Sequence, residues 1–404
     1  MHSLAALFGL EKITPQKARA LSIVYASSLA LMMGVNFIQP ALPALTEPFH
    51  VSDAQLSWIM TLFTAPAIFL SPIFGFIADL YGRRLLLAYG LMVFGLFGAA
   101  MAFAPSYSWL LAFRTVQGIG FSAVIPLTIV LIGDLLEGDH EISGQGLKVF
   151  LDRIGYLIFP PLGGLLATIA WFWPFVFYLL AIPLGFVALF CMPETKRKDR
   201  PINYLGGILR LTRRPRLMIA FCAGFLRFFL DYGFLTYLPL FLVRTHGIST
   251  ASAGALYVFF AGGAMATSSQ AGRIAAGRDK ANILFVAFVV SGAAVVAVPF
   301  IPGVWLTGGA LFFYGLANGV ISPMQKSLLT QNAPVDLRGG IVSVDRVIQQ
   351  VSKTSSTSVV GLLLVGADLP TIFWLLGILS FISVGLMACL LPRGQDPLSS
   401  PSVS

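Results

Sequence analysis

The sequence has few of the residues from which metal centres and catalytic sites are usually built. It contains three cysteines and four histidines among 404 residues, and neither type occurs with the spacing of metal ligands. A phosphate-binding loop of the form G-x-x-x-x-G-K-[ST] is absent, which leaves direct ATP hydrolysis without support. No nucleophile stands with a general base in a recognisable grouping. We therefore expect no metal, no cofactor and no enzymatic activity.

Charged residues are scarce as well. They make up 11% of the chain, whereas hydrophobic residues make up 57%, and the mean hydropathy is +0.85. This balance excludes an ordinary soluble domain. Apolar stretches of about 20 residues recur throughout, and each is long enough to cross roughly 30 Å of hydrocarbon as a helix. The sequence predicts twelve transmembrane helices, at residues 19–43, 53–79, 84–104, 107–136, 143–170, 172–192, 215–243, 250–273, 281–301, 304–331, 340–366 and 369–391.

The distribution of the basic residues indicates an orientation in the membrane. A net charge of +9 would suggest nucleic-acid binding in a soluble protein. Most of the lysines and arginines, however, fall on one side of the predicted spans, whereas Arg244 falls in a loop on the other side. Cytoplasmic connections carry such an excess of basic residues. We therefore expect both termini in the cytoplasm and no nucleic-acid partner.

The ten residues between the second and third spans read Gly75-Phe-Ile-Ala-Asp79-Leu-Tyr-Gly82-Arg83-Arg84. The glycines would let helix ends pack closely around a turn, and the carboxylate and guanidiniums offer an ion-pair latch at the membrane surface. The pattern G-x-x-x-D-x-x-G-R-R at this position resembles the signature of the major facilitator superfamily of secondary transporters. It implies that Asp79 faces the start of the eleventh helix near Arg338. A short solvated loop is the alternative, but it explains neither the spacing nor the flanking spans.

Other features repeat at a separation of nearly half the chain. Asp152-Arg153 in the fifth span recurs as Asp345-Arg346 in the eleventh. The resemblance therefore implies an all-α membrane protein of two six-helix halves in the same orientation, with a substrate site between them near the midplane. The expected divisions are a cytoplasmic tail at 1–18, halves at 19–192 and 215–391, a cytoplasmic linker at 193–214 and a second tail at 392–404.

The fourth span contains Arg114-x-x-Gln117-Gly118-x-Gly120, which resembles the arginine motif of proton-coupled members. Arg114 would place a permanent positive charge in the interior, where it would favour the ionised form of a nearby carboxylate. Substrate arrival or a conformational change could reverse that effect. An arginine that is permanently paired to hold helices together is the alternative.

The fifth span contains Gly155-x-x-x-Phe159-Pro160-Pro161-x-Gly163-Gly164. This segment resembles the motif G-x-x-x-G-P-x-x-G-G of the antiporter branch, with Phe159 in place of the middle glycine. Two prolines and flanking glycines produce a kinked helix with a close-packing face, which suits rocking of one half against the other. A kinked helix with a purely structural role is the alternative.

The first span ends with Asn36-Phe-Ile-Gln39-Pro-Ala-Leu-Pro43, similar to the first-span signature of drug:proton antiporters. Several relatives carry an aspartate where Asn36 stands. An amide cannot take up a proton at physiological pH, so a proton carrier must lie elsewhere in this chain. Asn36, Gln39 and Gln117 are candidates for hydrogen bonds to a substrate in a central cavity, and bonds to neighbouring helices are the alternative.

Ionisable residues inside the spans are energetically costly and are therefore functional candidates. Asp152, Asp231 and Asp345 are the candidate proton carriers, together with Arg114 as a coupling residue. Asp231 lies four residues after Arg227 on the same helix face, so this pair could simply neutralise itself. Static pairs and pairs that exchange during transport fit the sequence equally well. The candidate charge partners of the carboxylates are Arg153, Arg227, Arg346 and Lys353.

These motifs together resemble the twelve-helix drug:proton antiporter branch of the superfamily. The resemblance implies alternating access in which proton entry drives export of a small organic molecule, either a drug or a metabolite. Proton-coupled uptake of a small metabolite is the runner-up, and a membrane receptor or a lipid-embedded enzyme is a remote alternative. Buried charges of both signs leave room for a zwitterionic or anionic metabolite, including a siderophore-like compound. We expect a monomer in a bacterial cytoplasmic membrane, with substrate, protons and lipid as its partners.

Overall fold

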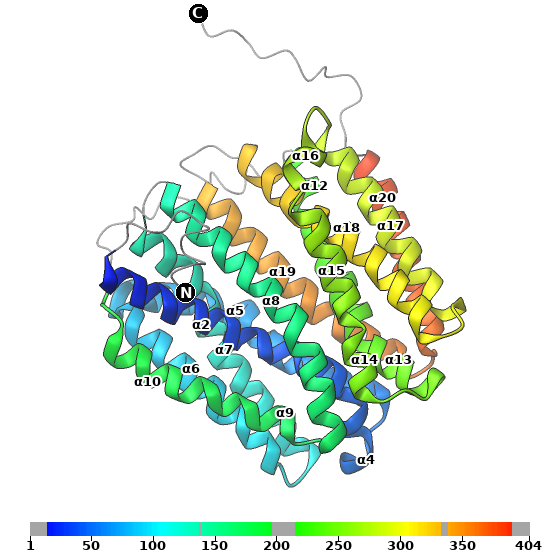
Figure 1. The fold of residues 1–404 in the computed structure, drawn as a ribbon, viewed down its shortest axis with the longest axis horizontal. Coiled ribbons are helices and arrows are strands. Elements are labelled where there is room, and N and C mark those ends of the chain that lie inside the picture. Colours follow the sequence, from blue (N-terminus) through cyan, green and yellow to red (C-terminus); the bar gives the residue numbers. More distant parts are fainter. Residues whose placement is uncertain (1–13, 137–138, 196–214, 333–337, 390–404) are drawn as a thin grey trace, which may run out of the picture.

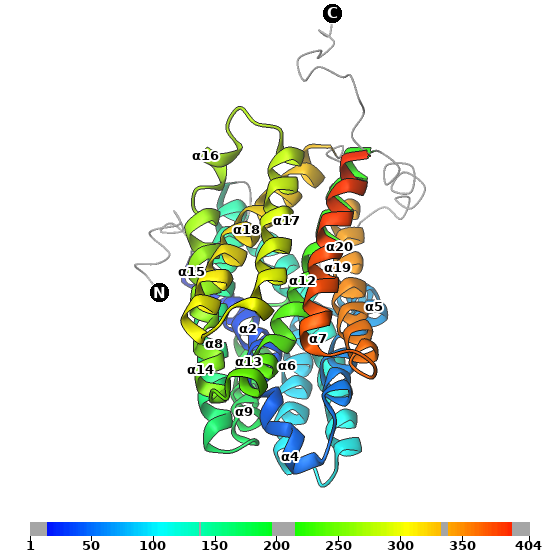
Figure 2. The same ribbon diagram turned by 90° about the vertical axis from the view of Figure 1, so that its right-hand side faces the viewer.

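The computed structural model describes residues 14–136, 139–195, 215–332 and 338–389. Within these ranges every regular element is a helix, and the long helices lie side by side in a bundle (Figure 1). The two ends of this bundle are named here by the elements found at each of them. The α4 end contains α4 and the connection before α14, and the linker end contains Gly82, residues 193–195, the end of α18 and the start of α19. Figure 2 shows α4 at the bottom of the bundle and α16 at the top.

The first half of the chain forms six membrane-crossing segments, several of which are interrupted by short 3-10 turns. Its helices are α2 (Pro15–Asn36), α3 (Ile38–Ala41), α4 (Thr46–Phe49), α5 (Asp53–Tyr81), α6 (Arg83–Ala100), α7 (Tyr107–Leu135), α8 (Asp139–Ile169), α9 (Trp173–Val176) and α10 (Ala181–Cys191), with 3-10 turns η1 (Leu42–Leu45), η2 (Met101–Phe103) and η3 (Phe177–Leu180).

The second half repeats this arrangement, with a π-helical turn in its first segment. Its elements are α12 (Pro215–Leu230), the π-helical turn η4 (Asp231–Leu235), α13 (Thr236–His246), α14 (Thr250–Ala255), α15 (Tyr257–Ser268), α16 (Ala271–Ala275), α17 (Lys280–Ala297), the 3-10 turn η5 (Val298–Phe300), α18 (Val304–Gln331), α19 (Arg338–Leu363) and α20 (Leu369–Cys389).

Eleven helical segments of the described chain are long and apolar enough to cross a membrane. The predicted span at 340–366 is also a long helix, α19, but it is not one of these eleven: it carries Asp345, Arg346 and Lys353 together with glutamines, serines and threonines. It packs between α5 of the first half and α12 of the second half, which places these charged residues inside the bundle. The predicted all-α membrane fold is confirmed, with eleven apolar spans and a twelfth, polar helix.

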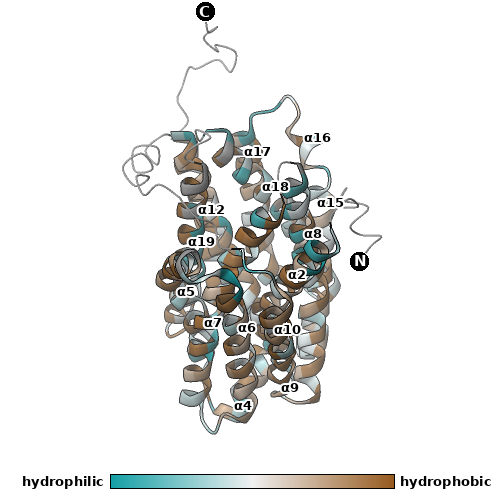
Figure 3. Cartoon of the chain, turned by 90° about the vertical axis from the view of Figure 1, so that its left-hand side faces the viewer, coloured by the Kyte–Doolittle hydropathy of each residue, from teal (hydrophilic) through white to brown (hydrophobic). Residues whose placement is uncertain are grey.

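The apolar composition accounts for the outer surface of the bundle. Figure 3 shows hydrophobic residues over most of the helical surface, whereas hydrophilic residues gather toward the linker end on α8, α17 and α18. Exposed large side chains such as Phe69, Phe103 and Trp305 would be unfavourable in water but suit contact with lipid. Because hydrophobic side chains cover the outside of the bundle as well as its core, polar side chains are what mark special positions in the interior.

The halves meet along three sets of helices. Helix α5 packs against α19, α8 packs against α14 and α15, and α3 packs against α13. Each of these contacts joins a helix of the first half to a helix of the second. The polar face of α19 and the proline-rich helix α8 therefore lie at the boundary between the halves, where a site that responds to their relative movement has to be built.

Candidate functional site

The halves are joined by side-chain bonds from the α4 end inward to the middle of the bundle. Arg244 of α13 forms an ion pair with Asp53 of α5, at 2.5 Å between Nη2 and Oδ1. Deeper in the bundle, the hydroxyls of Thr61 and Thr357 lie 2.9 Å apart. The hydroxyl of Thr354 donates to that of Thr64 over the same distance. The structure is thus closed at its α4 end.

Gln39 takes part in this closure. Its amide nitrogen donates to the hydroxyl of Thr236 in the second half, over 3.0 Å. Asn36, one helical turn earlier, is 1% exposed, and neither atom of its amide has a hydrogen-bond partner in the described structure. In this closed arrangement Gln39 links the halves, whereas Asn36 presents an unbonded amide inside the bundle.

Glycines allow the closest approaches between the halves. A Cβ atom added to Gly164 would lie 2.2 Å from the carbonyl oxygen of Thr250 in the second half. One added to Gly254 would lie 2.4 Å from the carbonyl oxygen of Pro160 in the first half. Two backbones can approach so closely only where one of them lacks a side chain at the point of contact. The predicted close-packing face of the fifth span therefore includes a contact between the halves.

The other residues of that motif pack within the first half. A Cβ atom at Gly163 would lie 2.5 Å from the carbonyl oxygen of Phe37, and one at Gly155 would lie 3.2 Å from Cβ of Met32. Pro160 and Pro161 lie inside α8, which continues through both of them. Gly163 and Gly155 thus hold α8 against the first segment, whereas Gly164 faces the other half.

The predicted latch is found at the linker end with partners that the sequence did not indicate. Arg83 forms an ion pair with Asp134 at the end of α7. Its backbone N–H donates to Oε1 of Glu194 over 2.7 Å. Gly82 has a φ of 104°, which favours glycine, and a Cβ atom added there would lie 2.6 Å from the Glu194 carboxylate. The segment thus ties together the ends of three spans within one half.

One expectation for this segment, on Gly75, needs correction, and another, on Asp79 and Arg338, stays a prediction. Gly75 has nothing within 4 Å of an added Cβ, so it is not needed for close packing in this arrangement. The side chains of Asp79 and Arg338 lie outside the described residues, and their contact across the halves remains a prediction. Arg84 is half-buried, and its Nε has no hydrogen-bond partner in the described structure.

Arg114 is fully buried and holds three helices together. Its Nη2 donates to the carbonyl of Gly34 over 2.6 Å, and its Nε donates to the carbonyl of Ile59 over 3.1 Å. Its Nη1 donates to Oε1 of Gln117, 2.6 Å away on the same helix, and the guanidinium lies over the ring of Phe63. Gln117 is itself completely buried rather than exposed to a cavity. These contacts favour the structural interpretation of Arg114 over the coupling one.

We expect Arg114→Gln to destabilise the protein by about 3 kcal/mol, because it leaves buried carbonyls without their charged donor. Thermal and denaturant unfolding in detergent would measure the loss. Arg216→Gln, which removes an exposed arginine at the start of α12, is the matched control and should change stability little. Wild-type stability combined with loss of proton coupling would instead support the coupling role.

Asp231 occupies the π-helical turn near the middle of its span. Its Oδ1 accepts hydrogen bonds from Tyr314 over 2.7 Å and from Asn318 over 2.6 Å, both on α18. Its Oδ2 lies 3.8 Å from Nε of Arg227, which also donates to Asn318. The predicted pairing of Arg227 with Asp231 is thus present, but it is part of a network that reaches the neighbouring helix. Tyr314 and Asn318 are members of the network that sequence reasoning missed.

A lysine from α19 completes this region. The ammonium of Lys353 lies 4.7 Å from the ring centroid of Phe228 and donates to Oε1 of Gln350 over 2.8 Å. It also interacts electrostatically with Asp231. Lys353 is therefore a cation near the carboxylate rather than its direct ion-pair partner.

The other two candidate carboxylates have different surroundings. Asp345 is 3% exposed and accepts bonds from the amides of Gln325, over 2.8 Å, and Gln349, over 2.6 Å, both in the second half. Asp152 is half-buried in α8 and accepts bonds from Lys148, over 2.8 Å, and from the hydroxyl of Ser28, over 2.7 Å. Neither repeated Asp-Arg pair is an internal ion pair, in keeping with the divergence of adjacent side chains on a helix.

Charges on the two halves face one another toward the linker end. Arg153 of α8 interacts electrostatically with Arg227 and Asp231 of the second half. Arg346 of α19 does so with Asp152 of the first half. Arg346 is exposed and Arg153 half-buried, so solvent reaches between the halves at this level. We call the nine charged side chains of this region the inter-half charge cluster: Lys148, Asp152, Arg153, Arg227, Asp231, Lys326, Asp345, Arg346 and Lys353.

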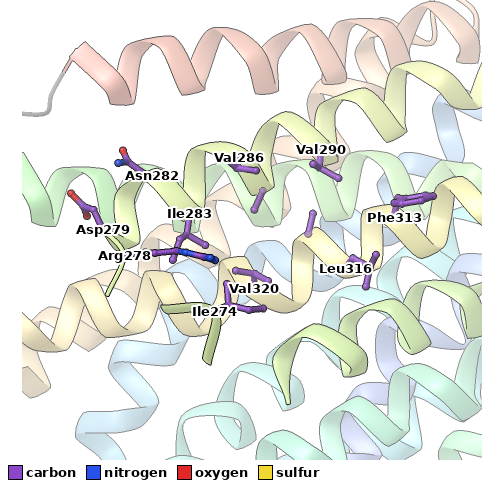
Figure 4. A pocket seen from close by; sticks show the side chains of 12 residues that line it. Ile274, Arg278, Asp279, Asn282, Ile283, Val286, Val290, Phe313, Leu316 and Val320 are labelled. Atoms are coloured by element: carbon purple, nitrogen blue, oxygen red, sulfur yellow. The ribbon is translucent and has the colours of Figure 1, made fainter. Parts of the chain in front are cut away.

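A surface cavity of about 700 Å³ lies elsewhere, on the outside of the second half. It is bounded by α17 and α18, with Val286, Val290 and Phe313 along its apolar wall and Arg278 near one end (Figure 4). None of its lining residues belongs to the first half. The cavity therefore cannot provide a path between the halves, and the inter-half charge cluster remains the candidate site.

Comparisons with known proteins agree with this architecture. The sequence profile described as Major Facilitator Superfamily matches residues 24–357. The chain is 29% identical over 347 residues to the bacillibactin exporter of Bacillus subtilis, a match that covers 80% of this chain and 84% of that one. It is also 29% identical over 209 residues to the lincomycin resistance protein of Streptomyces lincolnensis, covering 50% of this chain and 43% of that one.

Solved structures with low sequence identity have the same fold. A bacterial homologue of the human lysosomal transporter Spinster superposes with a TM-score of 0.76 at 15% identity, covering 93% of this chain and 96% of that one. A D-xylose-proton symporter superposes with a TM-score of 0.75 at 14% identity, covering 93% and 98% of the two chains. At these identities the likeness concerns the arrangement of the helices.

Proposed function

Because the chain belongs to the Major Facilitator Superfamily and is therefore a membrane transporter rather than an enzyme, we propose that it exports a small organic molecule in exchange for protons. The transport would proceed by alternating access between the two halves. Similarity to a bacillibactin exporter over most of the chain favours export. We further propose that the protein acts as a monomer in a bacterial cytoplasmic membrane with both termini in the cytoplasm, so that the linker end faces inward.

The observation that carries the proposal is the place of Asp231. This buried carboxylate lies in a π-helical turn, and such turns are frequent at functional sites. It interacts electrostatically with Arg153 of the other half. A proton on Asp231 would remove that attraction between the halves. The equilibrium between the conformation closed at the α4 end and the conformation closed at the linker end would then change. A titratable group placed in this way can couple proton binding to rocking.

The direction of proton movement tests the proposal. Purified protein would be reconstituted into liposomes that contain a pH-sensitive dye, and a compound shown to bind the purified protein would be added on one side. Exchange predicts that protons move opposite to the compound, and an imposed proton gradient should drive the compound against its own gradient. Movement of both in the same direction would establish uptake symport instead. Transport that is indifferent to pH would rule out proton coupling.

A further inference from the structure

The inter-half charge cluster has an excess of positive charge. It contains six basic side chains and three carboxylates, so basic groups outnumber acidic ones by three when all are ionised. The carboxylates are already engaged, since Asp152, Asp231 and Asp345 each accept at least two hydrogen bonds. Of the basic groups, Lys326 and Arg346 are exposed, so part of the excess is accessible to solvent between the halves.

The positive charges are shared between the halves and repel one another. Lys326 of α18 interacts electrostatically with Arg227 and Arg346 of its own half and with Lys148 and Arg153 of the other. Both Lys326 and Arg346 are exposed, which permits access from solvent. Like charges on opposing surfaces raise the energy of any state that brings them closer. Closure of the linker end would bring these surfaces together, so it requires a counter-charge.

We propose that the inter-half charge cluster binds an organic anion, and that this anion is the counter-charge that permits closure of the linker end. Its negative groups would bridge Arg153 of the first half and Arg346 of the second, since guanidiniums bind carboxylate and similar anions through paired hydrogen bonds. The half-buried ring of Phe228, which lies near Lys353, is the aromatic group in the same region that could contact the rest of the molecule.

This inference rests on the proposed exchange, and it explains why the anion and the proton would move in opposite directions. An anion lowers the net charge between the halves and favours closure of the linker end, whereas a proton on Asp231 raises the net charge and favours its reopening. Two ligands that bias one conformational equilibrium in opposite directions support exchange rather than co-transport. A membrane potential that is negative inside would also act in favour of anion export.

The charge preference can be tested with two dyes that share a xanthene skeleton, carboxyfluorescein as the anion and rhodamine 123 as the cation. Fluorescence anisotropy would measure their binding to the full-length protein in nanodiscs of uncharged lipid at pH 6.5. We expect carboxyfluorescein to bind at least about tenfold more tightly and its affinity to fall with rising salt. Equal affinity for the two dyes, including no measurable binding of either, would overturn the proposal, as would a preference for rhodamine 123.

Variants locate the site. Arg346→Gln removes an exposed charge and should weaken carboxyfluorescein binding about fivefold, the order expected for one charge pair in contact with solvent. Arg346→Lys keeps the charge and should restore most of the affinity, and Arg153→Gln should weaken binding as Arg346→Gln does. Arg278→Gln, at the outer surface cavity, is the matched control and should bind as wild type. A loss of affinity in the control equal to that of Arg346→Gln would show non-specific attraction and contradict the assignment.

These measurements separate the inference from the function on which it rests. Binding in nanodiscs needs no proton gradient, so an absence of exchange in liposomes would leave the anion preference intact and refute only the proton coupling. Conversely, proton-driven export of a neutral or cationic compound, together with no anion preference, would refute the anion site and leave the exchange reaction standing.

Discussion

Replacement of Asp231 by asparagine is expected to reduce proton-driven transport about 100-fold, near the upper range of coupling between two ligands. The amide has almost the same size and can still accept hydrogen bonds from Tyr314 and Asn318, so the fold should persist. It cannot, however, take up and release a proton, and it removes the attraction to Arg153. Transport driven by an imposed pH gradient would be compared with equilibrium exchange of the same compound, which should remain within about threefold of wild type.

The other buried carboxylates supply the comparison. Asp345→Asn is a matched control, because the hydrogen-bond partners of Asp345 are two neutral amides of its own half. We expect it to keep gradient-driven transport. Asp152→Asn is the third member of the series, since Asp152 bonds to a lysine and a serine within the first half. If all three variants retain gradient-driven transport, none of these carboxylates carries the proton and the coupling proposal is wrong.

Gly164→Val is expected to shift the conformational equilibrium away from closure of the α4 end by about tenfold or more. The added Cβ would lie 2.2 Å from a backbone oxygen of Thr250, and backbone atoms cannot move aside as a flexible side chain can. Overpacking of this kind costs roughly 1–3 kcal/mol, and here the cost arises only when the halves are closed at the α4 end. The variant should therefore populate the state that is open there.

Distances between spin labels would measure this shift. The native cysteines Cys191, Cys222 and Cys389 are exposed and would be replaced first. Labels at Ser106 of the first half and Thr245 of the second, both exposed near the α4 end, should report a longer distance in the variant. Gly262→Val is the matched control, because it places the same residue in a helix where nothing lies within 4 Å of the added Cβ. An unchanged distance distribution in Gly164→Val would refute the assignment of Gly164 to the closing contact.

Sequence reasoning succeeded where the information is local. Hydrophobicity accumulates along the chain, so each apolar run predicts its own helix without knowledge of its neighbours. The glycine at Gly82 likewise reflects a local need, since its backbone has a positive φ. The span at 340–366 was predicted from its apolar stretches like the others, and it is a helix in the structure although it is not among the eleven apolar segments. Evidence of this kind belongs to single segments of the chain.

The partners of the functional side chains required the tertiary structure. Arg83 is paired with Asp134 and bound to Glu194, which lies 111 residues away in the sequence. Arg114 carried a motif associated with coupling, yet it bonds to backbone carbonyls and an amide. Adjacent residues on a helix point about 100° apart, so a small rotation of a helix changes which neighbour a side chain meets. No pattern within one span specifies that rotation.

The sequence by itself determined that this chain is a bundle of membrane-spanning helices in two similar halves with ionisable residues inside. Only the tertiary structure decided that Asp231 belongs to a network with Tyr314 and Asn318, and that Arg153 and Arg346 face charges of the opposite half. The physical reason is that insertion into a membrane depends on the summed polarity of a segment, whereas a binding site depends on distances between side chains of different segments. Packing of the halves sets those distances.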